Sequence, residues 1–203
     1  MSEKEMRMKH TQMRENTGRA IMDAFWKLYR ERPIEKISVK EICETAGYNR
    51  STFYEYFTDS YSVLEAVEEE LLEYVRSSLR RDLPAALARS FPNISIENET
   101  LRQISKLYTE KGEYLSALLG ANGDPSFQYK YKRAVKDTLL RMLDDPAKKF
   151  DLSAGIVAEF TASAIIGAFN CWYPHRAEYP VEKYVTLLRK LLVNGSIAAI
   201  REL

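Results

Sequence analysis

Histidine and cysteine are scarce in this chain, since each occurs only twice among 203 residues. His10, His175, Cys43 and Cys171 are too few for a metal-ligand cluster, and they give no sign of a Cys/His pair for nucleophilic catalysis. The sequence also lacks a glycine-rich phosphate loop, an HExxH motif and a GxSxG motif. These absences argue against an enzyme and predict no catalytic residue, no metal and no cofactor. Both cysteines are expected to be core residues.

Membrane and export segments are also lacking. No uninterrupted apolar run reaches the roughly 18 residues of a membrane span. The N-terminal stretch MSEKEMRMKHTQMREN has no apolar centre of the kind found in a signal peptide. We therefore expect a cytoplasmic protein that binds no membrane. Hydrophobic residues make up 45% of the chain and charged residues 29%, which is typical of a globular protein.

Alternating strand patterns and internal repeats are absent, and helical spacing of apolar residues runs along the whole chain. The sequence therefore predicts an all-α fold. Pro33 is expected to stop the first helix and Pro84 to follow the end of a long one, whereas Asp124 and Pro125 are a helix start signal. Residues 83–99 are expected to be an irregular connection or a short helix. The expected helices are 17–31, 38–46, 49–57, a long helix from 59 or 60, 99–111, 114–120, 124–145, 152–173 and 181–203.

The segment ISVKEICETAGYNRSTFYEYF, residues 37–57, carries the clearest functional signal. Ser38 and Glu41 have the spacing of a capping box, which starts a first short helix. Gly47 supplies the left-handed backbone that ends this helix. Asn49 or Ser51 can cap a second helix, on which Phe53 and Phe57 form a buried stripe. The pattern is typical of a helix-turn-helix, whose second helix enters the major groove of DNA.

The outward residues of the second helix support this interpretation. They are polar groups that donate hydrogen bonds to phosphate oxygens or base edges, instead of the Lys and Glu usual on a solvated face. The alternative is an ordinary helical hairpin with exposed tyrosines. Residues 1–60 hold nearly equal numbers of basic and acidic side chains, so DNA attraction depends on local placement. The outward set is Arg50, Ser51, Thr52, Tyr54 and Tyr56.

Basic residues near the N-terminus form a candidate arm for the DNA backbone or minor groove. The alternative is a solvated terminus without a function. Lys36 and Lys40 add positive charge around the motif. The arm comprises Lys4, Arg7, Lys9, His10 and Arg14.

The stretch RAIMDAFWKLYRERPIEKISVKEICETAGYNRSTFYEYFTDSYSVLEAV resembles the N-terminal domain of the TetR family of transcriptional regulators. The resemblance runs from about Thr17 to Val67 without a gap. It rests on AF..L, on the helix pair, and on STFYEYF followed by a capped long helix. It implies a three-helix DNA-binding domain, here residues 1–60, joined by the long helix to an effector-binding and dimerisation domain, here residues 61–203.

Two positions depart from the pattern of this family. Ser60 stands where the family commonly has a phosphate-binding lysine, so a charged contact is lost. Glu55 is expected to face solvent or its own domain, because a carboxylate near DNA is repelled. The predicted DNA-binding residues are Ser38, Lys40, Asn49, Arg50, Ser51, Thr52, Tyr54, Tyr56 and Ser60.

The last two predicted helices favour a dimer. Residues 152–173 are apolar on most sides and rich in small residues, so something must cover them. With residues 181–203 from each of two chains they would form a four-helix bundle. The alternative buries the same surface within one chain. The predicted interface comprises Ala158, Ala162, Ile165, Phe169, Tyr184, Leu188 and Leu191.

Aromatic and polar residues of the C-terminal part could line a pocket for a small apolar or aromatic effector. Each is also a candidate core residue, and a buried Asn170 would need a hydrogen-bond partner. LLGANGDPSF and EF.ASAIIGA..CWY resemble a TetR branch that includes regulators of the dihydroxyacetone-kinase type, some of which act with a protein partner. The candidate pocket comprises Tyr108, Tyr114, Phe127, Tyr131, Phe169, Asn170, Trp172 and Tyr173.

The predicted function is therefore sequence-specific regulation of transcription. We expect a homodimer that binds double-stranded DNA at a palindromic operator, acts as a repressor and is released by a small effector. The alternative is a helical adaptor or coregulator that works through a protein partner.

Overall fold

A computed structural model describes residues 3–88, 98–120, 123–143 and 152–195. All regular elements in these ranges are helical, which confirms the predicted all-α class. The chain forms two compact units, Met1–Glu70 and Leu71–Leu203. The domain boundary expected at residue 60 stays a prediction. The elements are α1 (Glu3–Tyr29), η1 (Ile34–Lys36), α2 (Val39–Ala46), α3 (Arg50–Tyr54), α4 (Ser60–Ala88), α5 (Asn98–Leu119), α6 (Pro125–Leu143), α7 (Leu152–Trp172), η2 (Tyr173–His175) and α8 (Val181–Asn194).

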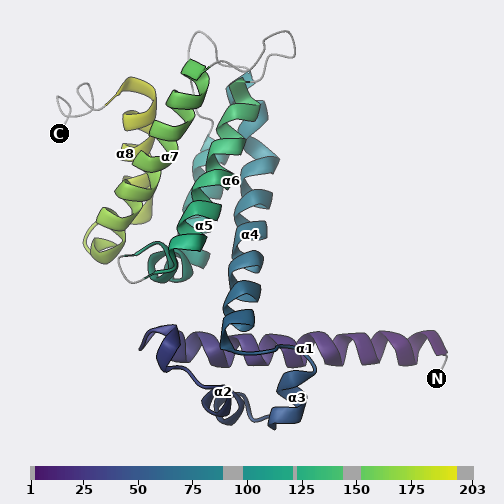
Figure 1. The fold of residues 1–203 in the computed structure, drawn as a ribbon. Coiled ribbons are helices and arrows are strands. Elements are labelled where there is room, and N and C mark those ends of the chain that lie inside the picture. Colours follow the sequence, from purple (N-terminus) through teal and green to yellow (C-terminus); the bar gives the residue numbers. More distant parts are fainter. Residues whose placement is uncertain (1–2, 89–97, 121–122, 144–151, 196–203) are drawn as a thin grey trace. The chain divides into compact units, whose positions relative to one another are not determined.

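Helix α1 is longer than the sequence analysis predicted, because it begins at Glu3 and not near Thr17. Its first turns contain no Pro or Gly and are rich in Glu, Lys, Met and Arg, all of which favour helix. The second half of α1 packs on α2 through the fully buried side chains of Ile21, Phe25 and Ile42 (Figure 1).

Helix α4 begins as predicted and ends later than predicted. The Asp59 carboxylate accepts a hydrogen bond from the Ser62 backbone N–H at 2.8 Å, and the Ser62 hydroxyl accepts one from the Asp59 backbone N–H at 3.2 Å. This reciprocal pair caps the helix start. The helix then continues past Pro84 to Ala88 instead of ending before the proline.

The C-terminal unit is a bundle in which α7 packs against α5, α6 and α8 (Figure 1). The start signal of α6 is confirmed, since the Asp124 carboxylate accepts from the Ser126 N–H at 2.7 Å. Glu159 of α7 pairs with Lys132 and, at 3.1 Å, with Lys136 of α6. Hydrogen bonds from the two lysines lower the pKa of the Glu159 carboxyl, so α6 and α7 are joined by charge as well as by packing.

A single helix, α5, replaces the two helices predicted for residues 99–111 and 114–120. Gly112 was expected to lie in a break between them. It serves instead as a point of close approach, because a Cβ built there would lie 2.5 Å from the Tyr173 ring. The glycine lets this ring pack directly on the helix.

Helix α7 has one buried and one exposed face. Gly155, Ala158, Ala162, Phe169 and Trp172 are buried within the chain. The opposite side is in water, with 69% of Leu152, 61% of Ile156 and 74% of Phe160 exposed. Cys171 is also exposed, so the prediction that both cysteines are core residues holds only for Cys43.

Candidate DNA-binding surface

The first helix of the motif is fixed by the predicted capping box. The Ser38 hydroxyl and backbone N–H both donate to a Glu41 carboxylate oxygen, at 2.7 Å and 3.0 Å, and the Glu41 N–H donates back to the hydroxyl at 3.3 Å. Arg32 donates to the other Glu41 oxygen at 2.8 Å. The Ser38 hydrogen bonds, helped by Arg32, lower the pKa of the Glu41 carboxyl. Through Arg32, the capping box also links the segment just before η1 to α2.

The turn forms as predicted, but the second helix is shorter than predicted: α3 ends at Tyr54 instead of residue 57, and Phe57 lies beyond it and is only half-buried. Gly47 ends α2 with φ of 75° and ψ of 25°, a conformation that side-chain-bearing residues rarely adopt. The Asn49 side-chain oxygen caps α3 by accepting from the Thr52 N–H at 2.8 Å and from the Ser51 hydroxyl at 2.6 Å. Phe53 is fully buried and anchors α3 in the unit.

Helix α3 contains four of the nine predicted contacts. Arg50 and Ser51 are exposed, Tyr54 is 58% exposed, and Thr52 is half-buried. Lys40 on α2 is exposed and lies 3.7 Å from Glu44, a surface pair that contributes little to stability. Arg50 and burial affect Cys43 in opposite directions, and burial prevails, raising the pKa of its thiol.

Three predicted contacts have structural roles in the free protein. Both donors of Ser38 are directed to Glu41, and Ser60 is buried at the start of α4. The half-buried Tyr56 ring lies against Gly18 of α1. Tyr48 in the turn is 37% exposed beside this surface and was not among the predicted residues. The sequence signal that could have identified Tyr48 is its position directly after Gly47, the glycine that caps α2.

The predicted effector residues mostly form an aromatic cluster. Tyr108, Phe127, Tyr131, Phe169 and Trp172 are buried, and most contact one another ring to ring at centroid separations of 5.1–6.1 Å. Tyr114 and Tyr173 are half-buried at its edge. Asn170 is exposed, not buried as considered above, and its amide donates to the Leu119 carbonyl at 2.9 Å, near the end of α5.

The predicted interface residues lie mostly on the inner side of the bundle. Ala158, Ala162, Phe169, Tyr184 and Leu188 are buried in one chain, while Ile165 and Leu191 are half-buried. An apolar groove of about 580 Å³ runs between α7 and α8. Its lining includes Cys171, Trp172, Tyr184, Leu188 and Leu191.

Helix α7 together with η2, Leu152–His175, is by length and composition apolar enough to cross a membrane. An 18-residue window of this segment has a mean hydropathy of 1.6, and 22% of the window is buried in the chain. A search for uninterrupted apolar runs missed it, because Glu159 and Asn170 interrupt the segment. Both residues bond to neighbouring helices, which places α7 in the bundle.

Family comparisons agree with this geometry in both units. A family model described as bacterial regulatory proteins, tetR family, matches residues 21–67. A second, described as a transcriptional regulator C-terminal region, matches residues 98–194. The uncharacterized HTH-type transcriptional regulator YxbF of Bacillus subtilis (strain 168) is 33% identical over 67 residues, which is 33% of this chain and only 18% of that protein.

Solved structures share the fold. A TetR transcriptional regulator from Streptococcus agalactiae 2603V has a TM-score of 0.61 at 22% identity, over 89% of this chain and 98% of its own. The dihydroxyacetone kinase operon activator DhaS has a TM-score of 0.56 at 20% identity, covering 92% and 97%. A tetR-family regulator from Streptomyces coelicolor reaches 0.63 at 19% identity, covering 93% and 83%.

A capped helix-turn-helix on a three-helix unit, with a polar second helix facing outward, defines a DNA-binding transcriptional regulator. Its C-terminal helices match a regulator C-terminal region. The chain belongs to the TetR family.

Proposed function

We propose that this regulator is a homodimeric repressor that binds an inverted-repeat operator. The observation that carries the proposal is the exposed face of α3, where Arg50, Ser51 and Tyr54 have no role in the core. A helix anchored by buried Phe53 and capped by Asn49 presents these groups in one fixed orientation, which direct recognition of base edges requires.

We assign two kinds of DNA contact to the predicted residues. Arg50, Ser51 and Thr52 are assigned to base edges, and Tyr54 and Lys40 to phosphates. Asn49 keeps its amide N–H groups for DNA, because only its side-chain oxygen is used in the cap. Ser38, Ser60 and Tyr56 support the surface through capping and packing. Glu55 is exposed and receives no DNA contact.

The exposed face of α7 is proposed as the dimer interface. Its apolar members Leu152, Ile156, Val157 and Phe160 are each more than half exposed. Burying a Phe or Ile side chain stabilises by about 1.5–3 kcal/mol, and a two-fold interface repeats each contribution. The apolar groove next to this face, bordered by Cys171, extends the surface that a second chain can cover.

A two-fold dimer presents two copies of α3 to DNA. Recognition helices about 34–36 Å apart fit successive major grooves, so the operator is an inverted repeat. Repression follows where this operator overlaps a promoter. We assign the protein to the cytoplasm, where bacterial DNA is accessible, and propose no enzymatic activity.

Release from DNA is proposed to follow binding to the C-terminal unit. A small apolar or aromatic effector at the predicted pocket would displace rings that now pack on one another. A protein partner that competes with the second chain for the exposed α7 surface is the second candidate, supported by the apolar area of that surface. In either case the ligand changes DNA affinity only if it binds the two states unequally.

Selection of bound duplexes from a random DNA library tests the proposal. The wild-type chain should enrich an inverted repeat, and the double variant Arg50→Ala, Tyr54→Ala should not. Tyr129→Ala is the matched control, because Tyr129 is 68% exposed on α6 and has no proposed DNA contact. Absence of enrichment by the wild type at low salt would favour the adaptor alternative. Enrichment of a single, unrepeated half-site would contradict the dimer.

A further inference from the structure

The N-terminal half of α1 extends the helix beyond the part that packs on α2. Arg14 lies four residues before Gly18, so helical register places the two on the same line of α1.

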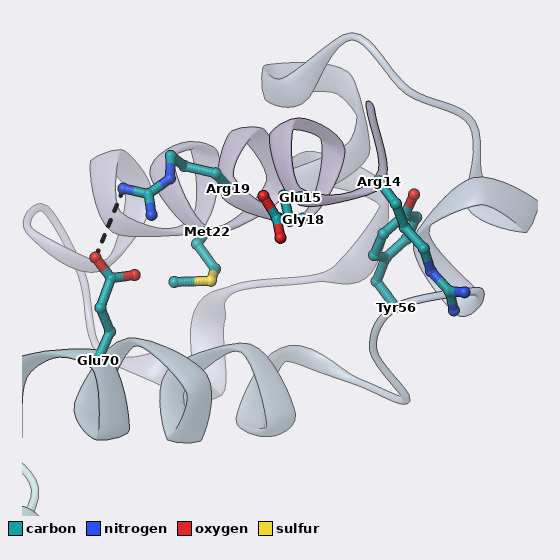
Figure 2. Close-up of a pocket in the computed structure, with 7 residues that line it drawn as sticks. All are labelled: Arg14, Glu15, Gly18, Arg19, Met22, Tyr56 and Glu70. Atoms are coloured by element: carbon teal, nitrogen blue, oxygen red, sulfur yellow. Dashed lines mark ion pairs between the residues drawn. The ribbon is translucent and has the colours of Figure 1, made fainter. Parts of the chain in front are cut away.

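Gly18 and Arg14 both contact Tyr56. A Cβ built on Gly18 would lie 3.5 Å from the Tyr56 ring, and the Arg14 guanidinium lies 5.8 Å from the centre of the same ring (Figure 2). Tyr56 follows α3 by two residues, and its backbone N–H donates to the Phe53 carbonyl at 3.0 Å. The ring therefore connects α1 directly to the end of the recognition helix.

Arg14 differs from Arg19 and Arg32 of the same unit in its charge partners. Arg19 lies 3.6 Å from Glu70, and Arg32 lies 2.8 Å from Glu41. No carboxylate pairs with Arg14 within the part of the chain that the structure describes. Exposed and oriented only by an aromatic ring, its guanidinium keeps its donors for an external anion.

Arg14 lines a hollow of about 500 Å³ that has charged residues at both ends. Arg14 and Tyr56 form one end, Arg19 and Glu70 the other, and Glu15 lies between them (Figure 2). The Glu15 carboxylate lies in the middle of the hollow, and the Glu70 carboxylate lies at the Arg19 end. The positive charge of Arg14 is therefore the one that has no carboxylate paired with it among the described residues.

We propose that Arg14, held on the Tyr56 ring, binds a DNA phosphate beside the half-site contacted by α3. The proposal rests on the proposed function and adds a second contact surface to it. An arginine fixed by a cation–π contact loses less freedom when it binds phosphate than one in open solvent. The partner is the duplex backbone, recognised by charge and not by sequence.

A phosphate contact has a specific signature. Neutralising one phosphate changes the slope of log affinity against log salt by about 0.9. Arg14→Ala should therefore reduce the slope by about 2 for a dimer and weaken selected and random duplexes by the same factor, on the order of 10-fold at low salt. A base contact would weaken the selected duplex more than the random one.

Fluorescence anisotropy of the full chain with the selected duplex, at a series of salt concentrations, tests this. Arg19→Ala is the matched control, because that arginine is on the same helix and paired with Glu70. Its salt slope should equal that of the wild type. Tyr56→Leu should behave like Arg14→Ala, whereas Tyr56→Phe keeps the ring and should behave like the wild type. Circular dichroism checks that each variant is folded.

The outcomes are distinguishable from failure of the proposed function. If the wild type binds no duplex, the proposed function itself fails. If it binds and Arg14→Ala leaves both affinity and slope unchanged, the Arg14 contact is overturned. Equal losses in Tyr56→Phe and Tyr56→Leu would show that the Tyr56 hydroxyl, and not the ring under Arg14, provides the interaction.

Discussion

Trp172 and Tyr184 stack face to face, with ring centroids 4.2 Å apart and ring planes 7° from parallel. The contact joins the end of α7 to the first half of α8. The Trp172 indole N–H also donates to the Tyr179 carbonyl at 2.7 Å, which holds the connection between these helices. Trp172 therefore contacts both α8 and the segment that connects α7 to α8.

Alkaline pH should destabilise the C-terminal unit. Burial raises the pKa values of Tyr108, Tyr131 and Tyr184 above the usual value of 10.0. Because the folded state binds these protons more tightly, the contribution is complete below about pH 10 and is lost as the pH rises beyond it. In a titration followed by tyrosinate absorbance, these hydroxyls should ionise only together with unfolding. Tyr184→Phe, which keeps the Trp172 stack, should reduce the alkaline loss. Ionisation of all 13 tyrosines in the folded protein would contradict this.

Charge on the outer face of α7 should separate the chains. Phe160→Glu places a carboxylate where we propose that a second chain packs, and the side chain is 74% exposed in one chain. We expect a shift from dimer to monomer in light scattering after gel filtration, together with weaker operator binding. Tyr129→Glu, at a similarly exposed aromatic position on α6, should remain dimeric. A dimeric Phe160→Glu variant would place the interface elsewhere.

Replacing Gly47 should destabilise the DNA-binding unit without any clash. A Cβ at this position meets nothing within 4 Å, so the cost of Gly47→Ala arises from the backbone at φ of 75°. That cost is about 1–2 kcal/mol. Urea unfolding followed by circular dichroism measures it. Gly47→Asn should lose less, since Asn tolerates the left-handed region better; equal losses would point to another cause.

The close contact of Gly112 and Tyr173 predicts coupled substitutions. Gly112→Ala should cost about 1–3 kcal/mol, because its Cβ would force the Tyr173 ring away from α5. In a Tyr173→Ala background the same change should be neutral or stabilising, since alanine favours helix over glycine. A double-mutant cycle from thermal unfolding measures the difference. Additive effects would show that the ring adjusts without cost.

The motif was predictable because its signals are local. Ser38 and Glu41 are three residues apart, Gly47 marks the turn, and Asn49 lies directly before α3. Each signal depends on neighbours within one or two helical turns, so no tertiary information was needed.

The bundle was less predictable, since its details depend on distant residues. Small and apolar residues lie on all sides of α7, so its sequence does not indicate which face packs inward. The buried face is determined by contacts with α5, α6 and α8. The same holds for Gly112, whose role depends on Tyr173, and for Tyr56, whose ring rests on Gly18. Of these features, only the break predicted near Gly112 is wrong, because α5 is continuous there.

The outward apolar face of α7 has a consequence for the amount of protein in the cell. If two chains must pair to cover Phe160 and Ile156, the concentration of the DNA-binding species rises with the square of the free-chain concentration while monomer predominates. Operator occupancy would then respond to synthesis more steeply than simple one-to-one binding allows. A modest change in expression would suffice to switch the regulated promoter.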